Sequence, residues 1–186
     1  MIKKHGSFVR ITGGEFKGRK IRTPGGGTHP MGERERIALF NIIGDRIKGN
    51  YVMDLYCGGG TLMIEALSRG ARWALGVDIS ENAVMTANEN LLDLGLIGIP
   101  GAFGGGAVQN DIPKVMRTAT DRYSIVIADP PYDTYDEKMV KYLPRVVFDG
   151  GMLIISHPGE APKLRGVRLV DSRKYAGATL SFYIKD

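Results

Sequence analysis

From residue 51 onward, short apolar runs alternate with stretches whose apolar residues recur at helical spacing. This alternation predicts βαβ units and a mostly parallel sheet. Helices are expected at 61–68, 80–94 and 136–143. Seven strands are expected, at 52–56, 73–79, a third ending near 108, 123–129, 151–156, 167–172 and 178–184. No helix separates the last two strands, so an α/β, Rossmann-like sheet ending in an antiparallel C-terminal hairpin is predicted.

The first part of the chain follows a different pattern. Alternating residues at 8–11 and 19–22, with a turn at Gly13-Gly14 between them, predict a short β-hairpin. After a loop over 24–32, apolar residues at helical spacing predict an amphipathic helix over 33–47. We therefore divide the chain into an N-terminal hairpin and helix extension, residues 1–48, and a main α/β domain, residues 49–186.

Composition excludes several classes of protein. With 186 residues, of which 43% are hydrophobic and 24% charged, the chain has the length and composition of one globular domain. It contains no apolar run near the roughly 20 residues of a membrane span and no signal peptide, so a cytoplasmic protein is expected. The single cysteine, Cys57, cannot form an internal disulfide. The three histidines are far apart in sequence, so no metal site is expected.

Positive charge is concentrated near the N-terminus. Residues 1–36 contain nine lysines and arginines and three acidic residues, a net charge of +6, whereas the whole chain carries +5. A basic arm on a nearly neutral body favours an acidic polymer such as RNA as a partner, although a solubilising surface accounts for the charge equally well. The candidate RNA-contacting residues are Arg10, Lys17, Arg19, Arg34 and Arg36.

Candidate ligand-binding residues follow the predicted strands, because ligands of open α/β sheets bind beyond the carboxyl ends of the strands. The first strand leads into D-L-Y-C-G-G-G-T at 54–61, where glycines let a ligand approach the backbone. A dinucleotide fingerprint needs glycine or alanine where the chain has Met63. This difference argues against the interpretation of the chain as a nicotinamide-dependent oxidoreductase. Asp78 and Asp111 follow the next two strands. An acid in the place of Asp78 can accept both hydroxyls of a ribose, and helix capping is the structural alternative for both acids.

The most specific motif is D-P-P-Y at 129–132, directly after a buried strand. Its two prolines fix the backbone and lack N–H donors, so that carbonyl groups and one carboxylate face outward. Such a set of acceptors suits a ligand that presents an NH₂ group. Tyr132 adds an aromatic face on which a base can stack.

Together these motifs resemble class I S-adenosylmethionine-dependent methyltransferases that modify amino groups. More closely, the chain resembles the RsmD family, bacterial enzymes that methylate N2 of a guanine in small-subunit ribosomal RNA. The resemblance covers nearly the whole chain. It is carried by residues 10–19, 38–41, 54–60, 65–71 and the D-P-P-Y motif at 129–132.

The resemblance implies a methyltransferase sheet of seven strands with S-adenosylmethionine as the cofactor. Asp54 and Gly58 would border the methionine part of this cofactor, Asp78 its ribose and Asp111 its adenine amine. Two further residues are expected at the cofactor, Gly60 and Ile79.

The resemblance also implies which residues hold the target base. Asp129, Pro130 and Tyr132 would be catalytic, and Pro131 would contact the substrate beside them. The expected partner is ribosomal RNA or a small-subunit ribonucleoprotein, and the protein is expected to act as a monomer.

The chain departs from the family pattern in three places. His29-Pro30-Met31 stands where the family usually has Arg-Pro-Thr, and Ile37 stands where a glutamate is usual. Near the C-terminus, Tyr175-Ala176-Gly177-Ala178 stands in place of Tyr-Gly-x-Thr. These positions are expected to face RNA, so the resemblance implies methyl transfer more firmly than it implies the nucleotide that is modified.

The expected reaction uses acceptors to activate a poor nucleophile. The Asp129 carboxylate and the Pro130 carbonyl would accept the two hydrogens of a guanine N2 amine and direct its lone pair at the methyl group. Two other functions stay open. A DNA adenine-N6 methyltransferase uses the same logic but usually carries asparagine in place of Asp129, and a non-catalytic RNA-binding protein would leave the D-P-P-Y motif without a role.

Overall fold

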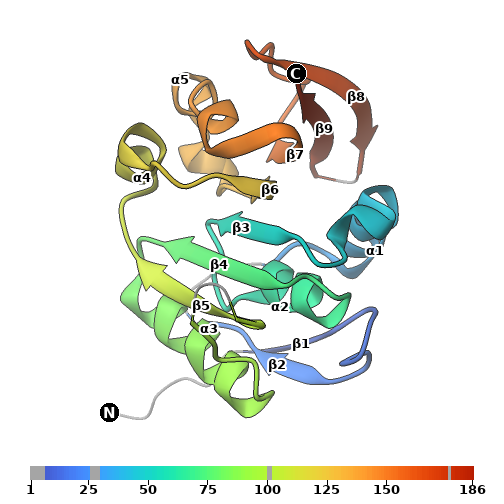
Figure 1. The fold of residues 1–186 in the computed structure, drawn as a ribbon, viewed down its shortest axis with the longest axis vertical. Helices are drawn as coiled ribbons and strands as arrows, with labels where there is room; N and C mark the ends of the chain where they lie inside the picture. Colours follow the sequence, from blue (N-terminus) through green and yellow to red (C-terminus); the bar gives the residue numbers. More distant parts are fainter. Residues whose placement is uncertain (1–6, 26–29, 100–101, 176) are drawn as a thin grey trace.

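The structure is a computed structural model that describes residues 7–25, 30–99, 102–175 and 177–186. His29 and Ala176, named above, lie outside these residues. The described part of the chain forms a seven-stranded sheet with helices on both faces and a separate two-stranded hairpin (Figure 1). Within these residues no helix has both the length and the apolar character needed to span a membrane.

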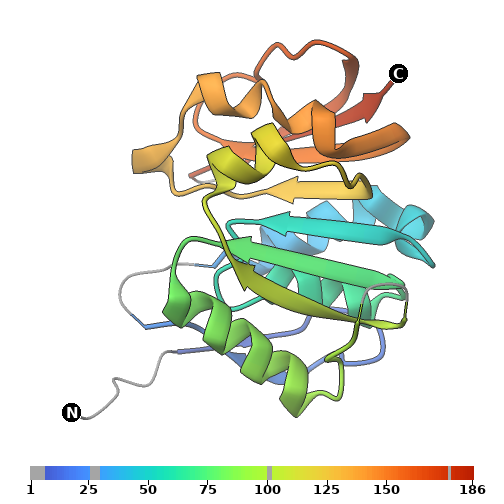
Figure 2. The same cartoon turned by 60° about the vertical axis from the view of Figure 1, so that its left-hand side comes forward.

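The main sheet has the strand order β5-β4-β3-β6-β7-β9-β8. Its strands are β3 (Tyr51–Leu55), β4 (Trp73–Asp78), β5 (Gly104–Gln109), β6 (Tyr123–Ala128), β7 (Val147–His157), β8 (Val167–Lys174) and β9 (Thr179–Lys185). The strands from β5 to β7 are parallel, as Figure 2 shows for β3, β4, β5 and β6, and β9 lies antiparallel between β7 and β8. The predicted fold class is therefore confirmed.

The chain order reverses between β3 and β6. From β3 the chain moves outward through β4 to β5, and it then crosses back so that β6 lies on the other side of β3. Adjacent parallel strands whose connections leave in opposite directions form the switch point of an open sheet, where ligands bind. Leu55 lies opposite Ala128 in this pair, so Asp54 and Asp129 come from neighbouring strand ends.

Two hydrophobic clusters cover the two faces of the sheet. One cluster joins the N-terminal segment, α1 (Glu33–Ile43), α2 (Thr61–Ser68) and α3 (Glu81–Asp93) to one face. The other joins α4 (Ile112–Thr118), α5 (Glu137–Val140) and the 3₁₀ segment Leu143–Val146 to the opposite face. Val52 and Met53 belong to different clusters, because successive side chains of a strand point to opposite faces.

The N-terminal extension is built into the first of these clusters. Its hairpin consists of β1 (Phe8–Arg10) and β2 (Lys20–Arg22), as predicted, and α1 follows after the loop. Ile11, Ile21, Leu39 and Phe40 are all at most 3% exposed and share the cluster with Val52 of β3. The extension therefore has no core of its own. The division of the chain into residues 1–48 and 49–186 stays a prediction about function.

Several helix predictions differ from the structure. The helix expected over 33–47 ends at Ile43, where Gly44 adopts a φ of +56°, and continues as the 3₁₀ turn Gly44–Ile47. The helix expected over 136–143 is the single turn α5, followed by Leu143–Val146 after Tyr142. α4 was not predicted, because its seven residues are too few to show a helical period.

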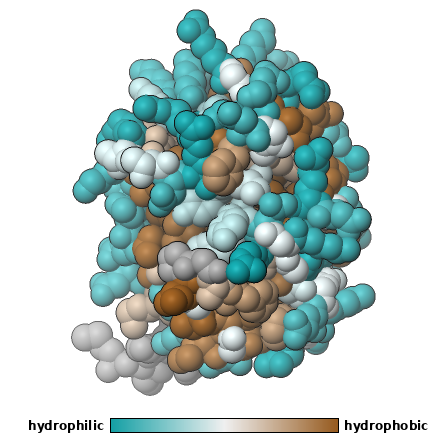
Figure 3. Space-filling view, viewed as in Figure 1, coloured by the Kyte–Doolittle hydropathy of each residue, from teal (hydrophilic) through white to brown (hydrophobic). Residues whose placement is uncertain are grey.

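The glycine run at 104–106 forms the first half of the edge strand β5. A Cβ at Gly105 would lie 2.7 Å from the Ala74 carbonyl oxygen of β4, and one at Gly104 would lie 2.7 Å from the Leu96 carbonyl oxygen. Glycine therefore lets β5 fit between β4 and the segment after α3. Exposed apolar side chains border this edge, and hydrophobic residues gather low on the face in Figure 3. Ile97, which pairs with Gly105, and Phe103, which directly precedes β5, are exposed side chains at this edge.

Candidate active site

A cavity of about 700 Å³ lies at the carboxyl ends of β3, β4, β6 and β7, at the switch point of the sheet. Residues from distant parts of the chain complete its wall. The N-terminal segment contributes Thr23, Pro24, Pro30, Met31 and Glu35, and the C-terminal hairpin contributes Gly177, Ala178 and Leu180. The N-terminal extension and the main domain therefore share one cavity.

The cavity is acidic although the chain as a whole is basic. Five carboxylate side chains line it: Glu35, Asp54, Asp78, Asp129 and Asp133. Among the described residues that form its wall there is no lysine, arginine or histidine. Such a surface favours ligands that carry positive charge or hydrogen-bond donors over ligands that carry phosphate at this position.

The glycine turn after β3 connects two of the predicted cofactor residues. The backbone N–H of Gly58 donates to Asp78 Oδ2 at 2.9 Å, and the N–H of Ser80 donates to Asp78 Oδ1 at 2.9 Å. Tyr56, which also lines the cavity, has a φ of +66°, a strained value for a tyrosine. Ile79 lines the cavity next to Asp78 and is 64% exposed. Gly58, Asp78 and Ile79 are thus brought together as predicted.

Gly60 and Asp111 do not belong to the described cavity wall. Gly60 faces α3, since a Cβ there would lie 3.1 Å from that of Ala87, and its φ of +81° suits glycine. Asp111 is exposed and caps α4 by accepting the Lys114 N–H at 2.8 Å. Burial raises the pKa of Tyr56, which lines the cavity, and the charge of Asp111 raises it further. Contact of either residue with a cofactor stays a prediction.

Asp54 is a buried carboxyl group with one unpaired oxygen. Its Oδ2 accepts the Met63 N–H at 3.1 Å, while Oδ1 has no hydrogen-bond partner among the described residues. Burial raises the pKa of Asp54 well above its usual range, and the charges of Asp129 and Asp78 raise it further. An unpaired carboxylate oxygen at the base of an acidic cavity favours a cationic donor from a ligand.

The D-P-P-Y motif leaves β6 at the other side of the switch point. The Tyr132 hydroxyl lies 2.7 Å from Ser156 Oγ, and Ser156 lies close enough to Asp129 to influence the pKa of that carboxyl group. Burial raises the pKa of Asp129, the hydrogen bond from Ser156 lowers it, and the nearby charge of Glu35 raises it. No described residue donates a hydrogen bond to the Pro130 carbonyl.

Sequence reasoning missed Ser156 and Glu35. Ser156 is 2% exposed and follows Ile155, which pairs with Ala128, so it lies beside Asp129 at the sheet edge. Ser156 is the penultimate residue of β7, and a serine at the end of a strand has no distinctive chemistry that would mark it as part of a site. Glu35 lies within a helix, and no sequence signal placed it in a cavity.

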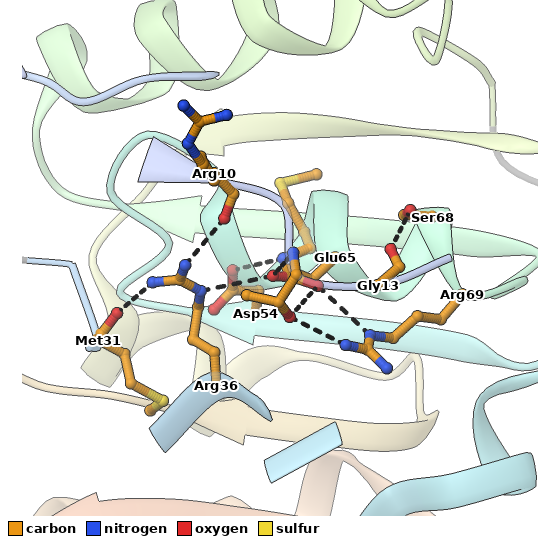
Figure 4. A network of polar contacts seen from close by, with 10 residues as sticks. Arg10, Gly13, Met31, Arg36, Asp54, Glu65, Ser68 and Arg69 are labelled. Carbon is orange, nitrogen blue, oxygen red and sulfur yellow. Dashed lines mark hydrogen bonds and ion pairs between the residues drawn. The ribbon is translucent and has the colours of Figure 1, made fainter. Parts of the chain in front are cut away.

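Arg36 corrects one prediction of RNA contact. Its side chain is buried, with 2% of the residue exposed, and Figure 4 shows it pointing inward from α1. It donates to the carbonyl oxygens of Arg10 and Met31, and its Nε lies 3.5 Å from Glu65 Oε1. Because the Arg36 side chain is buried and hydrogen-bonds these acceptors, it cannot reach phosphates at the surface. Arg36 instead holds the extension against α2.

The remaining basic candidates are exposed but lie outside the cavity wall. The turn that carries Lys17 and Arg19 is attached to the C-terminal end of α2, where Ser68 Oγ donates to the Gly13 carbonyl at 2.6 Å and accepts the Phe16 N–H at 2.9 Å. The side chains of Arg10 and Arg34 are also exposed. Pro131, the other substrate candidate, is exposed and lines the cavity. RNA contact by these residues stays a prediction.

Known proteins resemble this chain over most of its length. A Bacillus subtilis protein named "Putative rRNA methyltransferase YlbH" is 28% identical over 180 residues, covering 92% of this chain and 95% of that protein. "Ribosomal RNA small subunit methyltransferase D" of Escherichia coli is 30% identical over 125 residues, covering 67% of this chain and 60% of that protein. A solved Escherichia coli structure, "Putative methyltransferase yhhF", superposes with a TM-score of 0.84 at 24% identity and covers 97% of this chain and 99% of that one.

The family comparison spans nearly the whole chain. Residues 9–184 match the family described as conserved hypothetical protein 95. The matched residues include every described residue of the cavity wall, with the glycine turn and the D-P-P-Y motif among them. The chain therefore belongs to this family, and the RsmD-like methyltransferase resemblance predicted from its sequence is confirmed.

Proposed function

We propose that this protein transfers a methyl group from S-adenosylmethionine to the exocyclic N2 amine of a guanine in small-subunit ribosomal RNA. The similarity to ribosomal RNA methyltransferases supports the coarser activity, an S-adenosylmethionine-dependent rRNA methyltransferase. The guanine amine is our assignment. The observation that carries it is the pair of acceptors formed by the Asp129 carboxylate and the Pro130 carbonyl beside Tyr132 in an acidic cavity.

The residues of the cavity fit S-adenosylmethionine. This cofactor carries a sulfonium and an ammonium group, and when bound it supplies an electrophilic methyl group. We assign the ammonium to Asp54, whose Oδ1 is buried and unpaired, and the ribose hydroxyls to Asp78. Gly58 and Ile79 would border the same ligand, and Asp111 near the cavity would receive the adenine amine.

Asp129 and Tyr132 would position the target base. The Asp129 carboxylate and the Pro130 carbonyl accept the two N2 hydrogens, so the nitrogen lone pair is localised and directed. A raised pKa makes Asp129 a better acceptor for the proton that the amine loses as its bond to carbon forms. The ring of Tyr132, held by Ser156, provides the stacking surface. The guanine must leave a duplex to reach these groups.

We assign the exposed residues Arg10, Lys17, Arg19 and Arg34 to the RNA backbone, with Pro131 nearer the base. In this proposal residues 1–48 face RNA, residues 49–186 bind the cofactor, and the protein works in the cytoplasm as a monomer. Phosphate contacts of this kind contribute affinity that falls as salt concentration rises. The acidic cavity then selects the base, while the basic surface outside it supplies the affinity.

The test is transfer of labelled methyl groups to small ribosomal subunits and to total RNA from an unmodified source, with the product nucleoside identified by mass spectrometry. N2-methylguanosine in small-subunit RNA is the expected product. Label on adenine in DNA would replace this function with DNA adenine-N6 methylation. Absence of transfer together with RNA binding would leave a non-catalytic RNA-binding protein.

A variant pair tests the role of the motif. Asp129→Asn is expected to lower kcat about 10²–10³-fold, because it removes an electrostatic contact to the reacting amine. The dissociation constant for S-adenosylmethionine should stay within about threefold. Asp121→Asn, an exposed carboxyl after α4, is the control and should keep both values. Wild-type kcat in Asp129→Asn would remove Asp129 from the mechanism.

A further inference from the structure

Glu35 is an acidic residue in the cavity that the proposed reaction does not use. It lies in the first turn of α1, is half-buried and lines the same cavity as Asp129 and Tyr132. Gly32 leaves space for its carboxylate, because a Cβ at Gly32 would lie 2.2 Å from Glu35 Oε2. The start of the helix thus holds this carboxylate at the wall of the cavity.

The charge of Glu35 affects the pKa of both residues that would hold the base, Asp129 and Tyr132. Burial is the main cause that raises the pKa of Asp129 and of Tyr132, and the charge of Glu35 raises both further. No described residue forms an ion pair or a side-chain hydrogen bond with the Glu35 carboxylate. Two carboxylates that face one cavity repel each other unless hydrogen-bond donors lie between them. The pair therefore favours a ligand with adjacent donors on one edge.

The Watson–Crick edge of guanine has this arrangement. Its N1–H lies next to its N2 amine, so it offers a further donor beside the two hydrogens of the reacting amine. Adenine carries an unprotonated N1 beside its amine, and this nitrogen would face a carboxylate without a proton between them. Discrimination of this kind is strong, because the wrong base leaves buried polar groups unpaired.

We propose that Glu35 is a specificity-determining residue that accepts the N1–H of the target guanine while Asp129 holds its N2 amine. This inference rests on the proposed function, since it assigns a second contact to the same base. Selection of guanine then comes from two carboxylates, one at the end of β6 and one at the start of α1. α1 is held in place by the buried Arg36 and Glu65 pair.

The experiment compares two short RNAs that differ at one base, once the methylated guanine has been mapped. One contains guanine, and the other contains 2-aminopurine, which keeps the N2 amine but has an unprotonated N1. The wild-type kcat/KM for guanine is expected to exceed that for 2-aminopurine by at least about 100-fold. This comparison needs no variant, and equal use of the two bases by the wild-type protein would overturn the role of Glu35.

Glu35→Gln is expected to reduce this ratio at least tenfold, because its amide can donate to the unprotonated N1 of 2-aminopurine. Glu33→Gln, in the same helical turn but exposed, is the matched control and should keep the wild-type ratio. Equilibrium binding of the two RNAs should show the same loss of preference. An unchanged ratio in folded Glu35→Gln contradicts the inference alone, whereas failure of the wild-type protein to methylate guanine contradicts the proposed function.

Discussion

The hydroxyl of Tyr132 lies 2.7 Å from Ser156 Oγ, and the same serine lowers the pKa of the Asp129 carboxyl group. One hydroxyl from β7 therefore contacts Tyr132 and influences Asp129, the two side chains of the D-P-P-Y motif that we assign to the target base. Ser156 is 2% exposed, so it acts on the base through Asp129 and Tyr132 and is a positioning residue.

Ser156→Ala should shift the acid side of the pH profile of kcat upward. The hydrogen bond from Ser156 lowers the pKa of Asp129, and a hydrogen bond to a charged group is worth about 1.5–3 kcal/mol. Without it, the carboxylate that accepts the amine hydrogens is protonated at a higher pH, so activity is lost earlier on acidification. Ser124→Ala, on the neighbouring strand β6, is the control. A profile that does not move would assign Ser156 to packing alone.

Glu65→Gln should destabilise the protein by about 3–5 kcal/mol. Glu65 is completely buried and receives Arg36, Arg69 and both the N–H and the hydroxyl of Thr12. The substitution leaves a buried arginine without its counter-charge. Thermal unfolding is expected to show a fall in Tm of roughly 10 °C.

The control for Glu65→Gln is Asp171→Asn, which breaks the partly exposed contact with Arg173. Pairs of this kind contribute at most about 1 kcal/mol, so its Tm should change little. Equal effects of the two substitutions would mean that the buried network does not hold the extension.

Asp54→Asn should raise Tm by roughly 3 °C at neutral pH and weaken S-adenosylmethionine binding at least tenfold. The folded-state pKa of Asp54 is raised above its unfolded value of about 3.9. The folded protein therefore loses stability as pH rises from the unfolded-state pKa to the folded-state pKa. Asparagine removes this cost, and a gain of about 1 kcal/mol corresponds to the stated Tm change.

The gain of Asp54→Asn over the wild type should therefore shrink as pH is lowered toward 4, and calorimetry at several pH values measures this trend. Isothermal titration with the cofactor measures the loss of affinity. A variant that binds the cofactor as tightly as the wild type would show that Asp54 does not receive the ammonium.

Gly105→Ala should cost about 1–3 kcal/mol, while Gly106→Ala should be tolerated. A Cβ at Gly105 would lie 2.7 Å from the Ala74 carbonyl oxygen and 3.1 Å from Leu67 Cδ1, which overpacks the interface of β5. A Cβ at Gly106 meets no atom within 4 Å. Denaturant unfolding measures the free energy of unfolding of the two variants. Equal values would show that the close approach of β4 is not the reason for the glycine run.

The sequence was sufficient for the sheet and for the centre of the cavity. Asp54, Asp78 and Asp129 were found because each follows an apolar run, and the ends of parallel strands meet at one edge. Their neighbours in space are far away in sequence. Glu35 and Ser156 reach Asp129 only through the packing of α1 and the register of β7, and neither is visible in a local pattern.

Charge was the least informative part of the sequence. Arg34 and Arg36 are two residues apart in a basic segment, yet Arg34 is exposed and Arg36 is 2% exposed. The difference comes from the helical period, which turns Arg36 toward Glu65 of another helix. A count of basic residues cannot show that one of them has a buried acidic partner.

The cavity wall includes Thr23 and Pro24 near one end of the chain and Ala178 and Leu180 near the other. Leu180 belongs to β9, which pairs with β7 at the far side of the sheet. A folding intermediate that contains only the central strands β3, β4 and β6 would have the glycine turn and Asp129 but an open, solvated site. Competence for catalysis is thus a property of the complete fold, acquired only when both peripheral hairpins have docked.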